Sequence, residues 1–148
     1  MTTRHNKAIA ARWFTEFWGT TWNPGIVDEL CTDEVLLQYL LQAPHRGRDR
    51  VKAFMATFRG AFPDMRVAPA MDLVADGDYV VGRWAGSGTH TGPAYCDFLV
   101  GFLPAASGHQ MRFSGTTVLR LQNGRIAEQI GLDDGVTALL QLGLTGTS

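Results

Sequence analysis

The chain has 148 residues, of which 45% are hydrophobic and 18% charged, and its formal net charge is −1. This composition excludes intrinsic disorder and is typical of a globular domain long enough to bury its own core. Because 14 acidic residues offset the 13 basic ones, no net positive field favours a nucleic acid partner. No apolar stretch approaches the roughly 20 residues of a membrane span.

The first half of the chain predicts helices. Apolar residues recur at helical spacing in three segments, over 6–18, 24–30 and 51–62. Asn23 and Pro24 are start signals for the second of these helices, and Pro63 ends the third. Residues 34–41 are apolar on both faces and predict a short buried strand or extended segment between the helices.

The second half predicts antiparallel strands, because the apolar period changes from helical spacing to two. The expected strands cover 66–74, 79–90, 110–121 and 125–132. Asp76-Gly77 and Asn123-Gly124 are tight hairpin signals. The apolar run 94–103 has no clear period, and a short helix over 136–142 closes the chain before Gly143.

Helices followed by a run of strands predict an α+β fold, in which a curved, mostly antiparallel sheet is wrapped over the N-terminal helices. Such a sheet leaves a cone-shaped cavity at one end, which is a natural small-molecule site. The cysteines, Cys31 and Cys96, lie far apart. They predict free thiols in a reducing compartment, and since the N-terminus lacks a signal-peptide pattern we expect a cytoplasmic protein.

Eight segments together resemble one known family. They are NKAIA (6–10), VDEL (27–30), GRDRVKAF (47–54), AFPDMRV (61–67), GTHTG (88–92), FSG (113–115), NGRIAE (123–128) and LQLG (140–143). In this order they are similar to the SnoaL-like polyketide cyclases of the nuclear transport factor 2-like superfamily. The resemblance implies one SnoaL-like domain over 1–148, folded as a cone-shaped α+β barrel and assembled through the sheet as a homodimer or homotetramer.

The resemblance also implies a chemistry, namely intramolecular aldol ring closure without a cofactor. In that family an aspartic acid protonates the substrate carbonyl, helped by a histidine, inside an apolar pocket that raises the pKa of the acid. The aspartate position of the family falls on Gly131 of this chain, and the histidine position falls on Thr117. Neither residue can replace the acid–base pair, so the usual mechanism does not transfer directly.

Three other residues are candidates for catalysis. Asp97 lies in an apolar run, where an ionised carboxylate is costly, within a connection of 93–98 and 105–109 that is longer than is usual in the family. The alternative is that Asp97 caps a turn in an exposed loop. His90 matches the Gly-x-His-x-Gly segment and is suited to relay a proton, or it hydrogen-bonds a neighbouring loop. Asp134 precedes the last helix, where capping competes with catalysis.

Seven residues are candidates for contacting a substrate. They are Gln38, Tyr39, Trp84, Tyr95, Thr117, Gln129 and Asp133. Thr117, Gln129 and Asp133 share the strand face of position 131, although Asp133, like Asp134, is also placed to cap the last helix. Tyr39, Trp84 and Tyr95 offer flat apolar walls, with core packing as the alternative. His45 and His109 lack ligand spacing, so we expect no metal site, and the resemblance implies that no organic cofactor is needed.

The sequence therefore predicts a cofactor-independent acid–base enzyme, of the cyclase or isomerase type, acting on a hydrophobic polyketide-like carbonyl compound. The alternative from another class is a non-catalytic small-molecule-binding protein of the same fold, favoured by the residues at 117 and 131. A hydrolase similar to limonene epoxide hydrolase is the third possibility. It needs an Asp-Arg-Asp array, whereas Tyr95 stands at the arginine position and Gly131 at that of the second acid.

Overall fold

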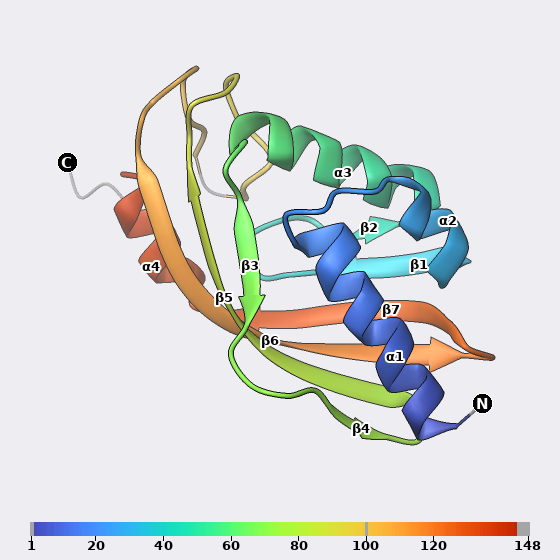
Figure 1. Ribbon diagram of the computed structural model, residues 1–148. Helices are drawn as coiled ribbons and strands as arrows, with labels where there is room; N and C mark the ends of the chain where they lie inside the picture. The colour runs from blue at the N-terminus through green and yellow to red at the C-terminus, as the bar shows by residue number, and fades with distance from the viewer. Residues whose placement is uncertain (1, 100, 145–148) are drawn as a thin grey trace.

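A curved sheet that wraps over the N-terminal helices forms the body of the molecule (Figure 1). The computed structural model describes residues 2–99 and 101–144. The strands are β1 (Cys31–Gln38), β2 (His45–Arg46), β3 (Arg66–Pro69), β4 (Val74–Asp76), β5 (Tyr79–Thr89), β6 (Gln110–Gln122) and β7 (Arg125–Asp133). The helices are α1 (Thr3–Trp13), the π-helix η1 (Phe14–Trp18), α2 (Gly25–Leu30), α3 (Arg48–Ala61) and α4 (Gly135–Gln141).

The sheet confirms the predicted fold class. Its strand order is β2-β1-β7-β6-β5-β3, with β4 also paired to β5. Neighbouring strands are antiparallel except for β1 and β7, which are parallel. The long β5–β6 ladder runs from Tyr79 opposite Arg120 to Thr89 opposite Gln110. The sheet does not close, so one end of the concave face stays open between the edge strands.

The single strand predicted over 66–74 is wrong, because the structure divides this segment into β3 and β4. Both strands pair with β5, but Pro69 lies opposite Trp84 and Val74 lies opposite Val81. From Pro69 to Val74 this segment advances five residues while β5 advances three. The surplus residues leave the ladder within 70–73. A strand predicted from the apolar period alone cannot reveal such an insertion.

The first predicted helix is two elements. α1 continues into the π-helix η1, whose wider turn changes which side chains face the sheet. Trp13, Phe17 and Trp18 are all buried, and the rings of Trp13 and Phe17 stack with centroids 4.1 Å apart. η1 thus adds the Trp18 ring to the aromatic side chains on the concave face of the sheet.

The hairpin signal at Asn123-Gly124 is confirmed by backbone geometry. Asn123 and Gly124 both have positive φ angles, 52° and 76°, as a tight turn between twisted strands requires. Pairing across this turn continues from Gln122 opposite Arg125 to Gly115 opposite Asp133. The turn therefore sets which residues of β6 and β7 lie side by side at the far end of the hairpin.

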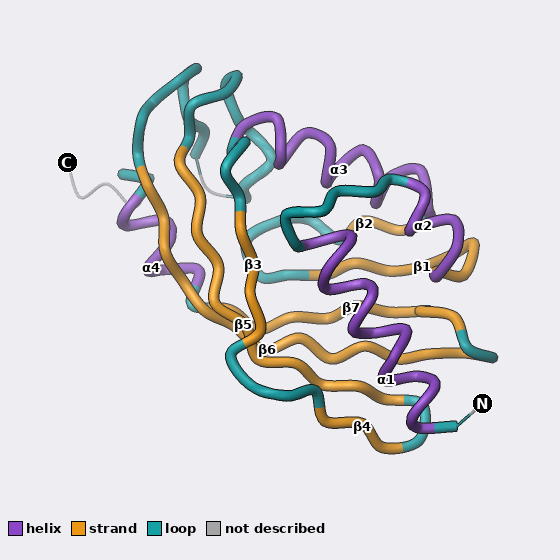
Figure 2. Tube along the Cα trace, viewed as in Figure 1, coloured by secondary structure: helices purple, strands orange, loops and turns teal. Residues whose placement is uncertain are grey.

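The long connection between β5 and β6 gathers at one end of the sheet, beside the C-terminal end of α3 (Figure 2). The N–H of Gly92 donates to the carbonyl of Ala61 in α3, and the run 94–103 folds back on itself through a bridge between Tyr95 and Leu103. Val100 of this run lies outside the described residues. Tyr95, Phe98 and Leu103 are buried, so the connection extends the core at this end.

Candidate functional site

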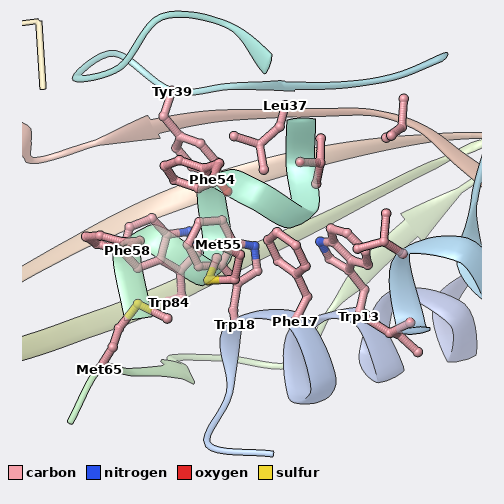
Figure 3. Close-up of a cluster of buried hydrophobic side chains, with 14 of the residues drawn as sticks. Trp13, Phe17, Trp18, Leu37, Tyr39, Phe54, Met55, Phe58, Met65 and Trp84 are labelled. Carbon is pink, nitrogen blue, oxygen red and sulfur yellow. The ribbon is translucent and has the colours of Figure 1, made fainter. Parts of the chain in front are cut away.

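An apolar pocket lies between the concave face of the sheet, η1 and α3. Its walls are mainly aromatic and include Trp18, Tyr39, Phe54, Phe58, Trp84 and Phe113. Figure 3 shows several of these rings converging from the helices and from the strands on the opposite side. The cavity between these walls has a volume of about 40 Å³ and opens to solvent on one side. Its aromatic, largely apolar lining suits a flat, apolar group of a small molecule.

The floor of the pocket holds a closed hydrogen-bond network. The Tyr39 hydroxyl and the Thr117 hydroxyl are 2.9 Å apart, and the indole N–H of Trp84 donates to Thr117 Oγ1 at 2.9 Å. All three residues are buried, and burial raises the pKa of Tyr39 far above its usual value. The Tyr39 phenol therefore stays protonated and serves as a neutral hydrogen-bonding group.

Beneath the floor, Gln129 ties the first helical segment to the sheet. Its side-chain Oε1 accepts hydrogen bonds from the indole N–H groups of Trp13 and Trp18, the latter at 2.9 Å. Gln129 is fully buried and does not line the pocket. Its contact to η1 instead holds Trp18 in the pocket wall.

Asp133, at the end of β7, brings a carboxyl group to the pocket. Among the described pocket-lining residues it is the one Asp or Glu. Its Oδ1 atom is buried and has no hydrogen-bond partner among the described residues. Burial raises the pKa of Asp133, the N–H of Gly135 acts in the opposite direction, and the charge of Asp134 adds to the increase. The site therefore favours the protonated acid more than water does.

The strand pairing explains why Asp133 is partly removed from water. Trp84, Gly115 and Asp133 are successive cross-strand partners on β5, β6 and β7. A side chain on Gly115 would meet the Trp84 ring, since its Cβ would lie 2.4 Å from Cζ2. The missing side chain lets the indole extend over β6 toward Asp133. Gly135 likewise leaves room, because its Cβ would lie 2.8 Å from Asp133 Oδ1.

The family model for SnoaL-like polyketide cyclases matches residues 8–142. The chain belongs to the SnoaL-like polyketide cyclase family. A comparison with curated protein sequences gave no match.

Solved structures show the same fold. A candidate SnoaL-like polyketide cyclase from Jannaschia sp. CCS1 is 22% identical, with a TM-score of 0.79 over 95% of this chain and 92% of that one. IdmH, a candidate polyketide cyclase from Streptomyces antibioticus, is 24% identical, with a TM-score of 0.71 over 93% and 98% of the two chains. An epoxide hydrolase from M. tuberculosis is 14% identical, with a TM-score of 0.70 over 95% and 90%.

In this SnoaL-like chain a tyrosine ring takes the place expected for the family's aspartate side chain. A Cβ on Gly131 would lie 1.9 Å from Cε1 and 2.4 Å from Cδ1 of Tyr39. Thr117 pairs with Gly131 across β6 and β7, and its hydroxyl is engaged by Tyr39 and Trp84. The two positions lie together, as the resemblance implies, but here they support an aromatic floor.

The three residues predicted to be catalytic do not line the pocket. Asp97 is exposed in the β5–β6 connection, where water solvates its carboxylate. His90 is buried, with Nδ1 2.8 Å from Ser107 Oγ and Nε2 2.7 Å from the Pro93 carbonyl. Asp134 is exposed at the N-cap of α4 and accepts a hydrogen bond from the Thr137 hydroxyl at 2.7 Å. Their catalytic roles stay predictions, without support from these positions.

The residues predicted to contact a substrate divide into two groups. Tyr39, Trp84 and Asp133 line the pocket, and Thr117 supports its floor from below. Gln38 is exposed, because it alternates with Tyr39 along the extended chain. Tyr95 is buried behind the wall, where its ring contacts Phe58 and Phe98. Tyr95, like Gln129, does not line the described pocket.

Sequence reasoning missed the share of the pocket that the helices provide. Phe14, Trp18, Phe54 and Phe58 read as the apolar stripes of amphipathic helices, which is also what a packed core needs. Helical spacing carries no signal that separates a cavity wall from a filled core. The signal for Asp133 was present, since 129, 131 and 133 share one face of a strand.

Within residues 2–99 and 101–144, no three or more His, Cys, Asp or Glu side chains gather in a way that would hold a metal ion. No helix of this described part has the length and apolar character needed to cross a bilayer.

Proposed function

We propose that this SnoaL-like protein catalyses proton transfer on a flat, hydrophobic carbonyl compound of the polyketide type, in a ring closure or isomerisation that needs no cofactor. The observation that carries the proposal is the Asp133 carboxyl at the edge of an otherwise apolar pocket, with one oxygen free of hydrogen bonds. Asp133 then takes the part of the family's acid from a position two residues further along the same strand face.

The chemistry follows from the position of this acid. Protonated Asp133 donates its proton to the substrate carbonyl oxygen, which makes the carbonyl carbon more electrophilic. The enol form of another carbonyl group in the same substrate attacks it through its α-carbon, and a carbon–carbon bond forms. The resulting Asp133 carboxylate accepts the enol O–H proton, so protons balance over the cycle and Asp133 is regenerated. The aromatic walls exclude water from the reacting atoms.

A panel of polyketide-type β-keto esters, followed by mass spectrometry and absorbance, tests this proposal. Asp133→Asn keeps the size of the side chain but cannot donate an acidic proton, so we expect kcat to fall by about 10²- to 10⁴-fold. Asp134→Asn and Asp97→Asn are matched controls, since both remove an exposed carboxylate nearby. Turnover that survives Asp133→Asn but not a control substitution excludes Asp133 as the acid.

A non-catalytic binding protein is the second candidate, and the closed floor favours it. Both family positions are committed to packing and hydrogen bonding around Tyr39. Recovery of an unmodified ligand from the purified protein, with no conversion of the panel over days, supports this alternative. The epoxide hydrolase reading has less support, because no arginine lines the described part of the pocket.

We also propose that two copies associate through the outer face of the sheet. Val74, Val81, Val118 and Ile130 are successive partners across β4, β5, β6 and β7. Val74, Val118 and Ile130 are exposed. The next row holds the Arg120–Glu128 ion pair, which gives this face both charges. A two-fold-related copy can match such a surface. Ile130→Asp is expected to yield monomers in sedimentation, whereas Thr116→Ser, on the same face, keeps the assembly.

A further inference from the structure

A second, larger concavity lies beside the pocket, between α1 and the edge strand β3. The volume of this groove is about 800 Å³. One wall is the face of α1 that carries Arg4, Lys7 and Ala8, and the other is β3 with the connection that leads to β4. The groove follows the free edge of the sheet, since β3 is the last strand in the order.

The groove concentrates positive charge in a chain whose net charge is −1. Four basic residues line it, and they are Arg4, Lys7, Arg66 and Arg83. The one acidic residue among its described lining is Asp72. None of the four basic side chains takes part in an ion pair within the described residues, whereas Arg12, Arg48, Lys52 and Arg120 do. By the strand register Arg66 and Arg83 share the outer face of the sheet with Val81. Arg4 and Lys7 of α1 are therefore the charges that remain available to an anion in the groove.

The walls of the groove are held in place by the fold. The buried side chain of Asn6 donates from Nδ2 to the Gly77 carbonyl at 3.1 Å, which fixes the start of α1 against the β4–β5 turn. Ile9 and Trp13 of the same helix are buried, so the exposed side chain of Lys7 stays on the groove side. The concavity is therefore formed before any ligand binds, which lowers the entropy lost on binding.

The groove and the pocket share a wall made by three residues. Phe14, Val67 and Trp84 line both spaces. The ring of Phe14 lies against β5 where Gly82 has no side chain, since a Cβ there would be 3.1 Å from two ring atoms. Phe14 belongs to η1, and π-helical segments are frequent at functional sites. Phe14 therefore forms part of the wall between the groove and the pocket.

We propose that the groove binds an amphipathic organic anion, whose acidic group is a carboxylate or a phosphate and whose apolar part packs against the wall shared with the pocket. The inference rests on the proposed function only in naming the substrate class for that pocket; the binding itself requires no reaction. Arg4 and Lys7 hold the anionic group, and Phe14 and Trp84 hold the apolar body.

A pair of fluorescent dyes tests the proposal. 8-Anilinonaphthalene-1-sulfonate is an aromatic anion, and N-phenyl-1-naphthylamine is nearly the same molecule without the sulfonate. The variant Arg4→Gln/Lys7→Gln removes both charges of the α1 wall. We expect it to weaken binding of the sulfonate about tenfold and to leave binding of the neutral dye within about twofold. Added salt should weaken sulfonate binding in the wild type and much less in the variant.

Controls separate charge in the groove from other causes. Arg50→Gln removes an exposed charge of α3 that lines neither space, and it should leave both affinities unchanged. Circular dichroism and Tm show whether each variant is folded. Competition by octanoate and by octyl phosphate identifies the acidic group, with octanol as the neutral control. An unchanged sulfonate affinity in the double variant, or equal competition by octanol, overturns the proposal.

The same assay distinguishes this inference from the catalytic proposal. Asp133→Asn is expected to abolish turnover without lowering sulfonate affinity, because Asp133 does not line the groove. Loss of turnover with intact groove binding therefore concerns the acid alone. If the charge effect is absent while turnover is intact, the groove proposal is wrong and the proposed role of Asp133 stands.

Discussion

Two neighbouring rows of the sheet make different use of the concave face. In one row Gly82, Thr117 and Gly131 are cross-strand partners, and the polar group in it is hydrogen-bonded to Tyr39 and Trp84. In the next row the partners are Trp84, Gly115 and Asp133, and a carboxylate oxygen is left without a donor. The polar group of the first row is thus already hydrogen-bonded within the protein, whereas the second row has a carboxyl oxygen that can hydrogen-bond a ligand.

Under the proposed function, the family fold keeps its pocket while the reactive group moves along the strand. Side chains on a strand return to the same face every second residue. An acid that is absent at position 131 can therefore be supplied from position 133 without a change of register. The space at 131 is then free for the Tyr39 ring, which seals the floor.

The pH dependence of turnover gives the largest expected effect, which concerns the second row. If protonated Asp133 is the acid, kcat/KM falls about tenfold for each pH unit above the pKa of Asp133. Because burial raises this pKa, the decline begins above the ordinary value of about 3.9. The measurement is a pH profile of the wild type with a substrate found in the panel. A profile that is flat from about pH 4 to 8 contradicts the role of this acid.

A side chain at position 131 tests whether the Tyr39 ring fills the space in the first row. Gly131→Ala places a Cβ within 1.9 Å of the Tyr39 ring and should cost about 3 kcal/mol by overpacking. For a chain of this length that lowers Tm by about 6–12 °C. In a Tyr39→Ala background the same substitution should cost almost nothing, since the obstacle is gone. Equal costs in the two backgrounds would show that the ring does not fill this space.

The hydrogen bonds of the floor predict a moderate loss of stability. Thr117→Val removes an acceptor that is buried between Trp84 and Tyr39, which leaves polar groups unsatisfied at a cost of about 1–3 kcal/mol. Denaturant unfolding measures the change. Thr116→Val, on the opposite face of β6, is the matched control and should change stability much less. A similar loss in both variants would show that the effect comes from placing valine in β6 and not from breaking the hydrogen bonds of Thr117.

The smallest expected effect concerns the stability that Asp133 takes from the fold. A carboxyl whose folded pKa is raised binds its proton more readily in the native state, so stability falls as pH rises through the interval between the unfolded and folded values. Asp133→Asn removes this penalty, and at pH 7 its Tm should exceed that of the wild type. The difference should vanish below the unfolded pKa of about 3.9. A lower Tm for the variant at pH 7 contradicts the sign.

Much of the architecture could be predicted from residues that are near one another in the chain. The change of apolar period at Pro63 separated helices from strands, and Asn123-Gly124 placed the last hairpin. The resemblance placed the two unusual residues, Thr117 and Gly131, which the structure brings opposite each other. The division of 66–74 into two strands could not be predicted, because extra residues in a ladder are recognised only when the partner strand is known.

The sequence by itself determined the elements, the turns and the absence of an acid at position 131, since these depend on local spacing and residue type. The tertiary structure alone decided that Tyr39 fills that position, that Asp133 reaches the pocket while Asp97 faces water, and that four basic residues line one groove. The physical reason is that burial, and with it the pKa of an acid, depends on segments far away in the chain that pack against it.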